Sequence, residues 1–142
     1  MTQGLILFAH GARDPAWAAP FEAVAALVRA RRPSWQVRLA YLELMSPPLA
    51  EAARALVAAG CRHITIRPMF LGTGGHVRRD LPLLLDELRR THADVEFTLH
   101  EPIGENTAVH AAMAEVIAEV SAEVSAEVSA EPQPTAGPRG AP

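Results

Sequence analysis

Apolar and polar positions follow two alternating periods along most of the chain. Short, nearly continuous apolar runs, such as LILFA at residues 5–9, are followed by longer stretches in which apolar residues recur every three or four positions. The first pattern is typical of buried parallel strands and the second of amphipathic helices. The alternation therefore predicts consecutive βα units, with parallel strands in one sheet and helices packed against it.

Four strands and four helices are predicted from these periods, which makes the fold class α/β with a four-stranded parallel sheet. Pro48 suits a first helical turn, and Gly60 suits the residue after a helix end. The predicted strands cover residues 3–9, 36–42, 62–68 and 95–100, and the predicted helices cover residues 16–31, 48–59, 80–91 and those from about 106 onward.

The C-terminal segment has a different pattern. AEVIAEVSAEVSAEVSAE repeats every four residues, so its valines and glutamates advance by about 40° per repeat around a helix of 3.6 residues per turn. Glutamates four residues apart also repel one another, so we expect the helix to fray beyond about Val120. We therefore divide the chain into an α/β domain over residues 1–120 and a segment over residues 121–142, which combines the repeat helix with a disordered Pro/Gly tail. An oligomerisation helix is the alternative interpretation of the repeat.

Composition narrows the possible partners. The net charge of −3 reflects the acidic repeat, because residues 1–114 hold twelve arginines against eleven acids. Neither a basic stripe nor interleaved aromatic residues indicate nucleic acid, and no apolar run reaches the ~20 residues that span a bilayer. The N-terminus does not resemble a signal peptide, and a single cysteine, Cys61, fits a reducing compartment. We expect a cytoplasmic protein without nucleic-acid or membrane partners.

Three side chains that can bind metals follow predicted strands. His10 follows the first strand, Glu43 follows the second, and His76 lies in the glycine-rich loop FLGTGGH after the third. Ligands of open parallel sheets bind outside the carboxyl ends of the strands, so these residues belong to one edge. Together they indicate a site for a first-row divalent metal or for proton transfer. His100, after the fourth strand, is a weaker candidate on the same edge.

The glycine-rich loop matches neither the G-x-G-x-x-G motif nor a P-loop, which argues against phosphate binding. Its glycines permit a tight turn or let the backbone approach a flat ligand closely. Arginines just beyond the two histidines would surround such a ligand with positive charge. These residues are Gly72, Gly74 and Gly75 in the loop, and Arg13, Arg78 and Arg79 beyond the histidines.

Four motifs in chain order resemble a known family. HGARDP, LEL with PPL, RPMFLGTGGHVRRDLP and EPIGEN follow the four predicted strands in turn. They are similar to motifs of the short, single-domain class II sirohydrochlorin chelatases of the CbiX/SirB family, over residues 3 to about 118. The resemblance implies a chelatase-like, three-layer α/β/α domain of flavodoxin-like topology. It also implies a lyase that inserts Co²⁺, Fe²⁺ or Ni²⁺ into sirohydrochlorin, in cobalamin or sirohaem biosynthesis. The metal is then a substrate, with no tightly bound cofactor.

The resemblance also implies roles for individual residues. Catalytic roles fall to His10, which is the proton acceptor, and to His76 and Glu43, and the two histidines bind the metal. Ala12 stands where the family commonly has serine, which removes a hydroxyl. Because related long enzymes enclose their ligand between two lobes, a homodimer with the tetrapyrrole between its subunits is implied. The implied tetrapyrrole contacts are Arg13, Met45, Leu71, Gly72, Thr73, Gly74, Gly75, His76 and Arg78.

Histidine suits this chemistry. Metal insertion removes two pyrrole protons, so the site needs a base that titrates near neutral pH and ligands that hold the metal moderately. Protonation of imidazole competes with metal binding, so activity is expected to fall as the pH drops through about 6.5. Two alternatives remain. One is a tetrapyrrole or metal carrier on the same fold, and the other is a phosphoryl-transfer enzyme of the histidine phosphatase kind, which Ala9 disfavours because those enzymes have arginine before the histidine.

Overall fold

The structure is a computed structural model that describes residues 2–130. Within that range, the side chains of His76 and of residues 120–130 are outside the description. The chain divides into two units between Asn106 and Thr107, and each unit is described by itself. The disordered tail predicted within residues 131–142 lies outside the described residues.

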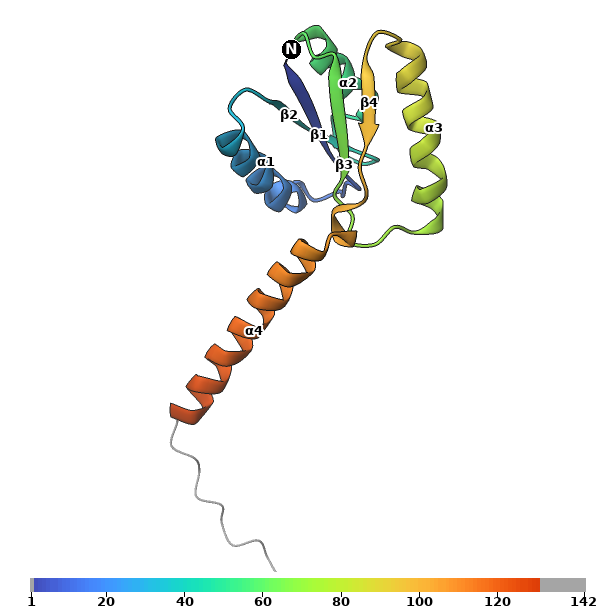
Figure 1. Ribbon diagram of the computed structural model, residues 1–142. Coiled ribbons are helices and arrows are strands. Elements are labelled where there is room, and N and C mark those ends of the chain that lie inside the picture. Colours follow the sequence, from blue (N-terminus) through green and yellow to red (C-terminus); the bar gives the residue numbers. More distant parts are fainter. Residues whose placement is uncertain (1, 131–142) are drawn as a thin grey trace, which may run out of the picture. The chain divides into compact units, whose positions relative to one another are not determined.

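A four-stranded parallel sheet forms the centre of the first unit (Figure 1). Its strands lie in the order β2-β1-β3-β4, which is the order of flavodoxin-like sheets. The predicted fold class and sheet are therefore confirmed, and β1 and β3 are the inner strands. The strands are β1 (Gln3–Ala9), β2 (Gln36–Tyr41), β3 (His63–Pro68) and β4 (Glu96–Leu99).

Helices cover both faces of this sheet, which gives the three-layer arrangement (Figure 1). Successive side chains of a strand point to opposite faces. Leu5 and Leu7 of β1 share a core cluster with Ala25 of α1 (Ala19–Arg31). Ile6 and Phe8 face the other way, into the larger cluster with α2 (Leu49–Ala58) and α3 (Gly75–Thr91). Because both faces are covered, β1 is a nearly continuous apolar run.

The start of α3 differs from the prediction. The helix begins at Gly75 rather than at Asp80, and its first backbone bond runs from the Arg78 N–H to the Gly74 carbonyl. The predicted start had placed Pro82 in the first helical turn, where proline is best tolerated. In the structure Pro82 lies inside the helix. His76 consequently belongs to the first turn of α3 and not to the preceding loop.

The other boundaries differ less. A short 3₁₀ helix, η1 (Pro15–Ala18), precedes α1, and the Asp14 carboxylate accepts a hydrogen bond from the Ala16 N–H at its start. A second one, η2 (Ile103–Glu105), follows β4. α1 begins at Ala19, three residues after its predicted start, because η1 takes the place of its first turn. The other strands and helices that differ, α3 aside, do so by one residue at an end, which is within the usual uncertainty of such boundaries.

The second unit contains α4 (Thr107–Ala130). Its helical backbone continues beyond Val120, which agrees with the predicted repeat helix and with the strong helix propensity of alanine and glutamate. The fraying expected there stays a prediction. The residue-120 boundary predicted from the repeat falls within this helix. Met113, Val116 and Ile117 are exposed on it. Among the described residues, no helix has the length and apolar character needed to cross a membrane.

Cys61 is a core residue. It is completely buried in the cluster beneath α2 and α3. Burial raises the pKa of the Cys61 thiol, and the nearby Arg62 guanidinium offsets only part of that effect. A buried thiol with a raised pKa is a poor nucleophile. The structure therefore gives Cys61 a packing role.

Candidate functional site

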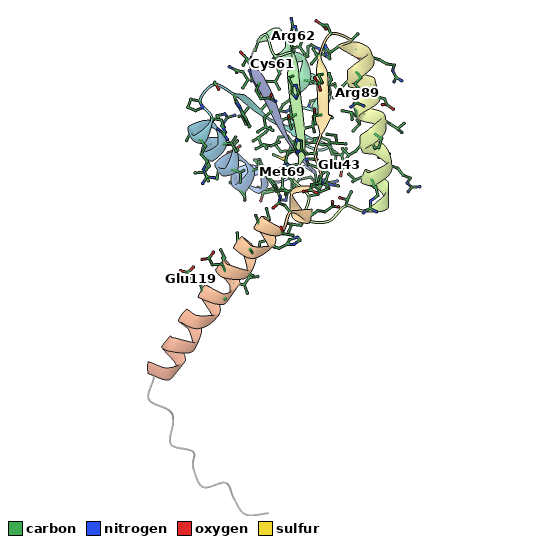
Figure 2. The ribbon with its side chains drawn as sticks, in the orientation of Figure 1. Glu43, Cys61, Arg62, Met69, Arg89 and Glu119 are labelled. Atoms are coloured by element: carbon green, nitrogen blue, oxygen red, sulfur yellow. The ribbon has the colours of Figure 1, made fainter. Side chains whose placement is uncertain are left out.

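His10 and Glu43 meet at the carboxyl edge of the sheet. They follow β1 and β2, which are neighbouring strands, and His10 Nε2 lies 3.0 Å from Glu43 Oε1. Their side chains are 49% and 55% exposed, so both are accessible to a ligand. Figure 2 shows Glu43 near Met69 at this end of the sheet, while Cys61 and Arg62 lie at the opposite end. The edge predicted from the carboxyl ends of the strands therefore holds a histidine–carboxylate pair.

The pairing with Glu43 determines which nitrogen of the His10 ring carries the proton. A carboxylate only accepts hydrogen bonds, so Nε2 of His10 donates to Glu43. Nδ1 of the neutral ring is then left with a lone pair that accepts a proton or binds a metal ion. A carboxylate in this position orients the ring.

The backbone around this pair leaves room only for glycine at residue 11. Gly11 has a φ of +97°, and a Cβ built on it would overlap with the carbonyl oxygen of Glu43. Two hydrogen bonds extend the β1–β2 pairing here, from the Glu43 N–H to the His10 carbonyl at 3.1 Å and from the Leu42 N–H to the Ala9 carbonyl at 2.9 Å. The HG pair in the sequence thus brings the two segments into backbone contact.

Leu44 occupies a strained turn directly after Glu43. Its φ is 63°, in the left-handed region that leucine rarely adopts. The Met45 N–H donates to the Glu43 carbonyl at 2.8 Å, which closes a three-residue γ-turn around Leu44. The Leu44 side chain is 59% exposed. An exposed leucine in a strained conformation beside a candidate catalytic residue is a functional candidate that the sequence analysis did not single out.

Phe70 supports His10 from the other neighbouring strand. It follows β3, is buried, and presents its ring to His10 at a centroid distance of 6.4 Å and an interplanar angle of 72°. Its ring also packs edge-on against Phe8 of β1 at 6.1 Å. The sequence analysis missed Phe70 as a site residue. The available signal was an aromatic residue directly after a strand that ends at the candidate edge.

The loop from Leu71 to Gly74 follows Phe70 along this edge. Leu71 is exposed, and the Thr73 hydroxyl oxygen is shielded from solvent with no hydrogen-bond partner among the described residues. Gly74 caps α3, and Gly75 is its first residue. The side chain of His76 is outside the description, so its predicted proximity to His10 stays a prediction. Within the described side chains, no three His, Cys, Asp or Glu residues converge on a metal position.

The other side chains predicted to contact the tetrapyrrole differ in their exposure and packing. Arg13 and Arg78 are exposed. Arg79 donates from Nε to the Gly75 carbonyl at 3.2 Å. Met45 is half-buried and packs against the cluster of Ala9, Ala18 and Tyr41, so part of its surface belongs to the core.

His100, the weaker candidate at this edge, forms a hydrogen bond with another residue. Its Nδ1 accepts a hydrogen bond from Arg67 Nη2 at 3.2 Å, because a guanidinium only donates. The structure therefore joins His100 to Arg67 and does not bring it to the His10–Glu43 pair.

The fold and the edge define the class of the protein. It is a flavodoxin-like α/β domain whose histidine–carboxylate pair lies at the carboxyl edge, beside the β1/β3 position where ligands of such sheets bind. The model of the CbiX family matches residues 4–120. The chain belongs to the CbiX family.

Individual relatives agree with this assignment. A sirohydrochlorin cobaltochelatase of Saccharolobus solfataricus is 33% identical over 107 residues, covering 71% of this chain and 82% of that protein. One of Sulfolobus acidocaldarius is 30% identical over 101 residues, covering 71% and 78%. Both are similar to this chain over most of their own length.

Solved structures extend the comparison. A CbiX protein from Marinobacter aquaeolei superposes with a TM-score of 0.76 at 31% identity, covering 85% of this chain and 98% of that one. SirB from Bacillus subtilis with Fe³⁺ gives a TM-score of 0.67 at 25% identity, with 77% of this chain matching 43% of SirB. The matched region thus accounts for less than half of the SirB chain.

Proposed function

We propose that the protein inserts a divalent metal ion into sirohydrochlorin. The observation that carries this proposal is the exposed His10–Glu43 pair at the carboxyl edge of a CbiX domain. Co²⁺ is the first metal to test, because the relatives just described are named cobaltochelatases. Fe²⁺ and Ni²⁺ suit the same ligands and are tested beside it. The proposed place is therefore cobalamin biosynthesis for Co²⁺ or sirohaem biosynthesis for Fe²⁺, and the metal is a substrate.

His10 is the proposed proton acceptor and a metal ligand. Insertion of M²⁺ replaces two pyrrole protons, which must leave the macrocycle as its nitrogens bind the metal. Nδ1 of His10 carries the free lone pair, which holds the metal first and takes one of the two pyrrole protons once the metal has passed to the ring, while the other proton leaves to solvent. The Glu43 carboxylate stabilises the imidazolium so formed. His76 is the proposed second metal ligand. Two neutral imidazoles leave coordination positions open for the ring nitrogens.

The tetrapyrrole is proposed to lie between two copies of the chain. This part of the proposal is supported by the SirB comparison, in which 43% of the longer chain matches this one. A homodimer supplies a second lobe and a second set of site residues. Arg13 and Arg78 are exposed and suit the many carboxylates of sirohydrochlorin, since guanidinium binds carboxylates through two parallel hydrogen bonds. We propose a cytoplasmic location for this reaction.

The deciding experiment is a metal-insertion assay with the purified protein. Sirohydrochlorin is mixed with Co²⁺, Fe²⁺ or Ni²⁺, and the change in its absorbance spectrum is followed with and without protein. The expected result is a faster spectral change with protein present, with repeated turnover. A rate equal to the protein-free mixture would exclude the chelatase, and ring binding without acceleration would support the carrier on the same fold.

Replacing Leu44 with glycine is expected to change stability and substrate binding in opposite directions. Glycine adopts a positive φ freely, so relief of the left-handed leucine stabilises the fold by about 1 kcal/mol. The exposed side chain is removed, so an apolar contact with the macrocycle is lost and the KM for sirohydrochlorin rises about tenfold. Urea denaturation and initial rates measure the two effects.

Leu27 provides the matched control for Leu44. It is equally exposed, at 59%, but lies in α1. Leu27→Ala is expected to leave the KM unchanged. A Leu44→Gly variant with wild-type KM would show that Leu44 does not contact the macrocycle.

A further inference from the structure

The segment after β4 is tied to the segment that supports His10. Its sequence is EPIGEN, residues 101–106. Arg67 of β3 donates from Nη1 to the Glu101 carbonyl at 3.0 Å, and the His100 N–H donates to the Ile66 carbonyl at 2.9 Å. These bonds bring η2 alongside the residues that follow β3.

Gly104, in the middle of η2, makes the closest approach. Its N–H donates to the Phe70 carbonyl at 3.0 Å. A Cβ built on Gly104 would overlap with three backbone atoms of Leu71, namely the carbonyl oxygen, the Cα and the carbonyl carbon. Backbone atoms cannot rotate away as a side chain does, so any larger residue at position 104 must displace Leu71 or the turn itself.

The glycines of the neighbouring loop behave differently. A Cβ at Gly72, Gly74 or Gly75 would meet nothing within 4 Å in the described structure. Of these four glycines, Gly104 is therefore the one whose backbone packs too closely against a neighbour to leave room for a side chain. The Gly104 N–H donates to the carbonyl of Phe70, and the ring of Phe70 packs beside His10.

We propose that Gly104 is a positioning residue for the chelatase site. By allowing η2 to pack directly on Phe70 and Leu71, it sets the place of the Phe70 ring beside His10 and the start of the loop that leads to α3. Gly104 acts through Phe70 and does not itself touch a substrate. The expected effect on metal insertion rests on the proposed function, whereas the effect on His10 does not.

Gly104→Ala tests the proposal, with Gly4→Ala as its control. A Cβ at Gly4 would also meet neighbours, Ile64 Cγ1 at 3.0 Å and Cys61 Cβ at 3.3 Å, but at the opposite end of the sheet. The readout independent of activity is the NMR signal of the imidazole Cε1–H groups of His10 and His63. Gly104→Ala is expected to move the His10 signal and leave that of His63, which is next to Ile64. Gly4→Ala is expected to do the reverse.

Kinetics give the second readout. Gly104→Ala is expected to lower kcat/KM for metal insertion about 10- to 100-fold, because small misplacements of catalytic groups have effects of this size. Gly4→Ala is expected to lower stability and keep kcat and KM. An unmoved His10 signal in folded Gly104→Ala overturns the positioning role, whether or not the wild-type protein is a chelatase. Absence of insertion by the wild-type protein counts against the proposed function alone.

Phe70→Leu covers the case in which Gly104→Ala does not fold. It keeps the backbone hydrogen bond from Gly104 and removes the ring beside His10. The expected result is a fall in kcat/KM in the same direction as for Gly104→Ala. Wild-type kcat/KM in folded Phe70→Leu would overturn the route from Gly104 through Phe70 to His10.

Discussion

His10→Ala is expected to lower the rate of metal insertion by about 10²- to 10⁴-fold, the usual contribution of a positioned general base. The variant removes the lone pair at Nδ1 and leaves Glu43 without its partner. The fold is expected to remain, because the His10 side chain is 49% exposed. Insertion rates with Co²⁺ and thermal unfolding measure the two outcomes.

The chain offers a matched control for this variant. His63 and Glu96 form a second histidine–carboxylate pair, with Nδ1 and Oε2 3.5 Å apart, at the amino ends of β3 and β4. His63→Ala is expected to keep full activity. His76→Ala is expected to lose insertion as His10→Ala does. Near-wild-type rates in both the His10 and His76 variants would mean that the site lies elsewhere.

Gly11→Ala is expected to damage both stability and activity. An L-residue at a φ of +97° costs about 1–2 kcal/mol. The overlap of the new Cβ with the Glu43 carbonyl adds to this cost and pushes the β2–α2 turn away from His10. A total loss of more than about 2 kcal/mol in the free energy of unfolding is expected, together with most of the insertion activity. Urea denaturation and the insertion assay measure these effects.

A Gly60→Ala variant separates the cost of the positive φ from the cost of the steric overlap. Its φ is +95°, nearly that of Gly11, but a Cβ there meets nothing within 4 Å. Gly60→Ala is therefore expected to show the conformational cost alone, with full activity. If Gly11→Ala is no less stable than Gly60→Ala and inserts metal normally, the contact between Gly11 and Glu43 has no role in the site.

The sheet could be predicted because its signal is local. Buried parallel strands give short apolar runs, and βα alternation then places their carboxyl ends along one edge. His10 and Glu43 were therefore assigned to the same edge from the sequence. Their direct contact depends on β1 and β2 being neighbours, which the strand order of the folded sheet decides.

The rest of the site depends on contacts between segments far apart in the sequence. Gly11 meets Glu43, and Gly104 meets Leu71, through backbone atoms that carry no sequence signal at their partner's position. The left-handed Leu44 runs against its own propensity, which is common where function requires strain. The start of α3 was predicted at Asp80, five residues late, because the glycines before it are typical of a loop.

The position of β1 has a consequence for how the substrates enter. β1 is hydrogen-bonded on both sides, whereas β2 and β4 are the outer strands. Amides of such an inner strand exchange with solvent only in the rarest, most complete openings of a domain. The proposed base, His10, directly follows one of the two inner strands. For the proposed reaction, we therefore expect the movement that admits the substrates in the turns after Glu43 and Phe70, and not in β1.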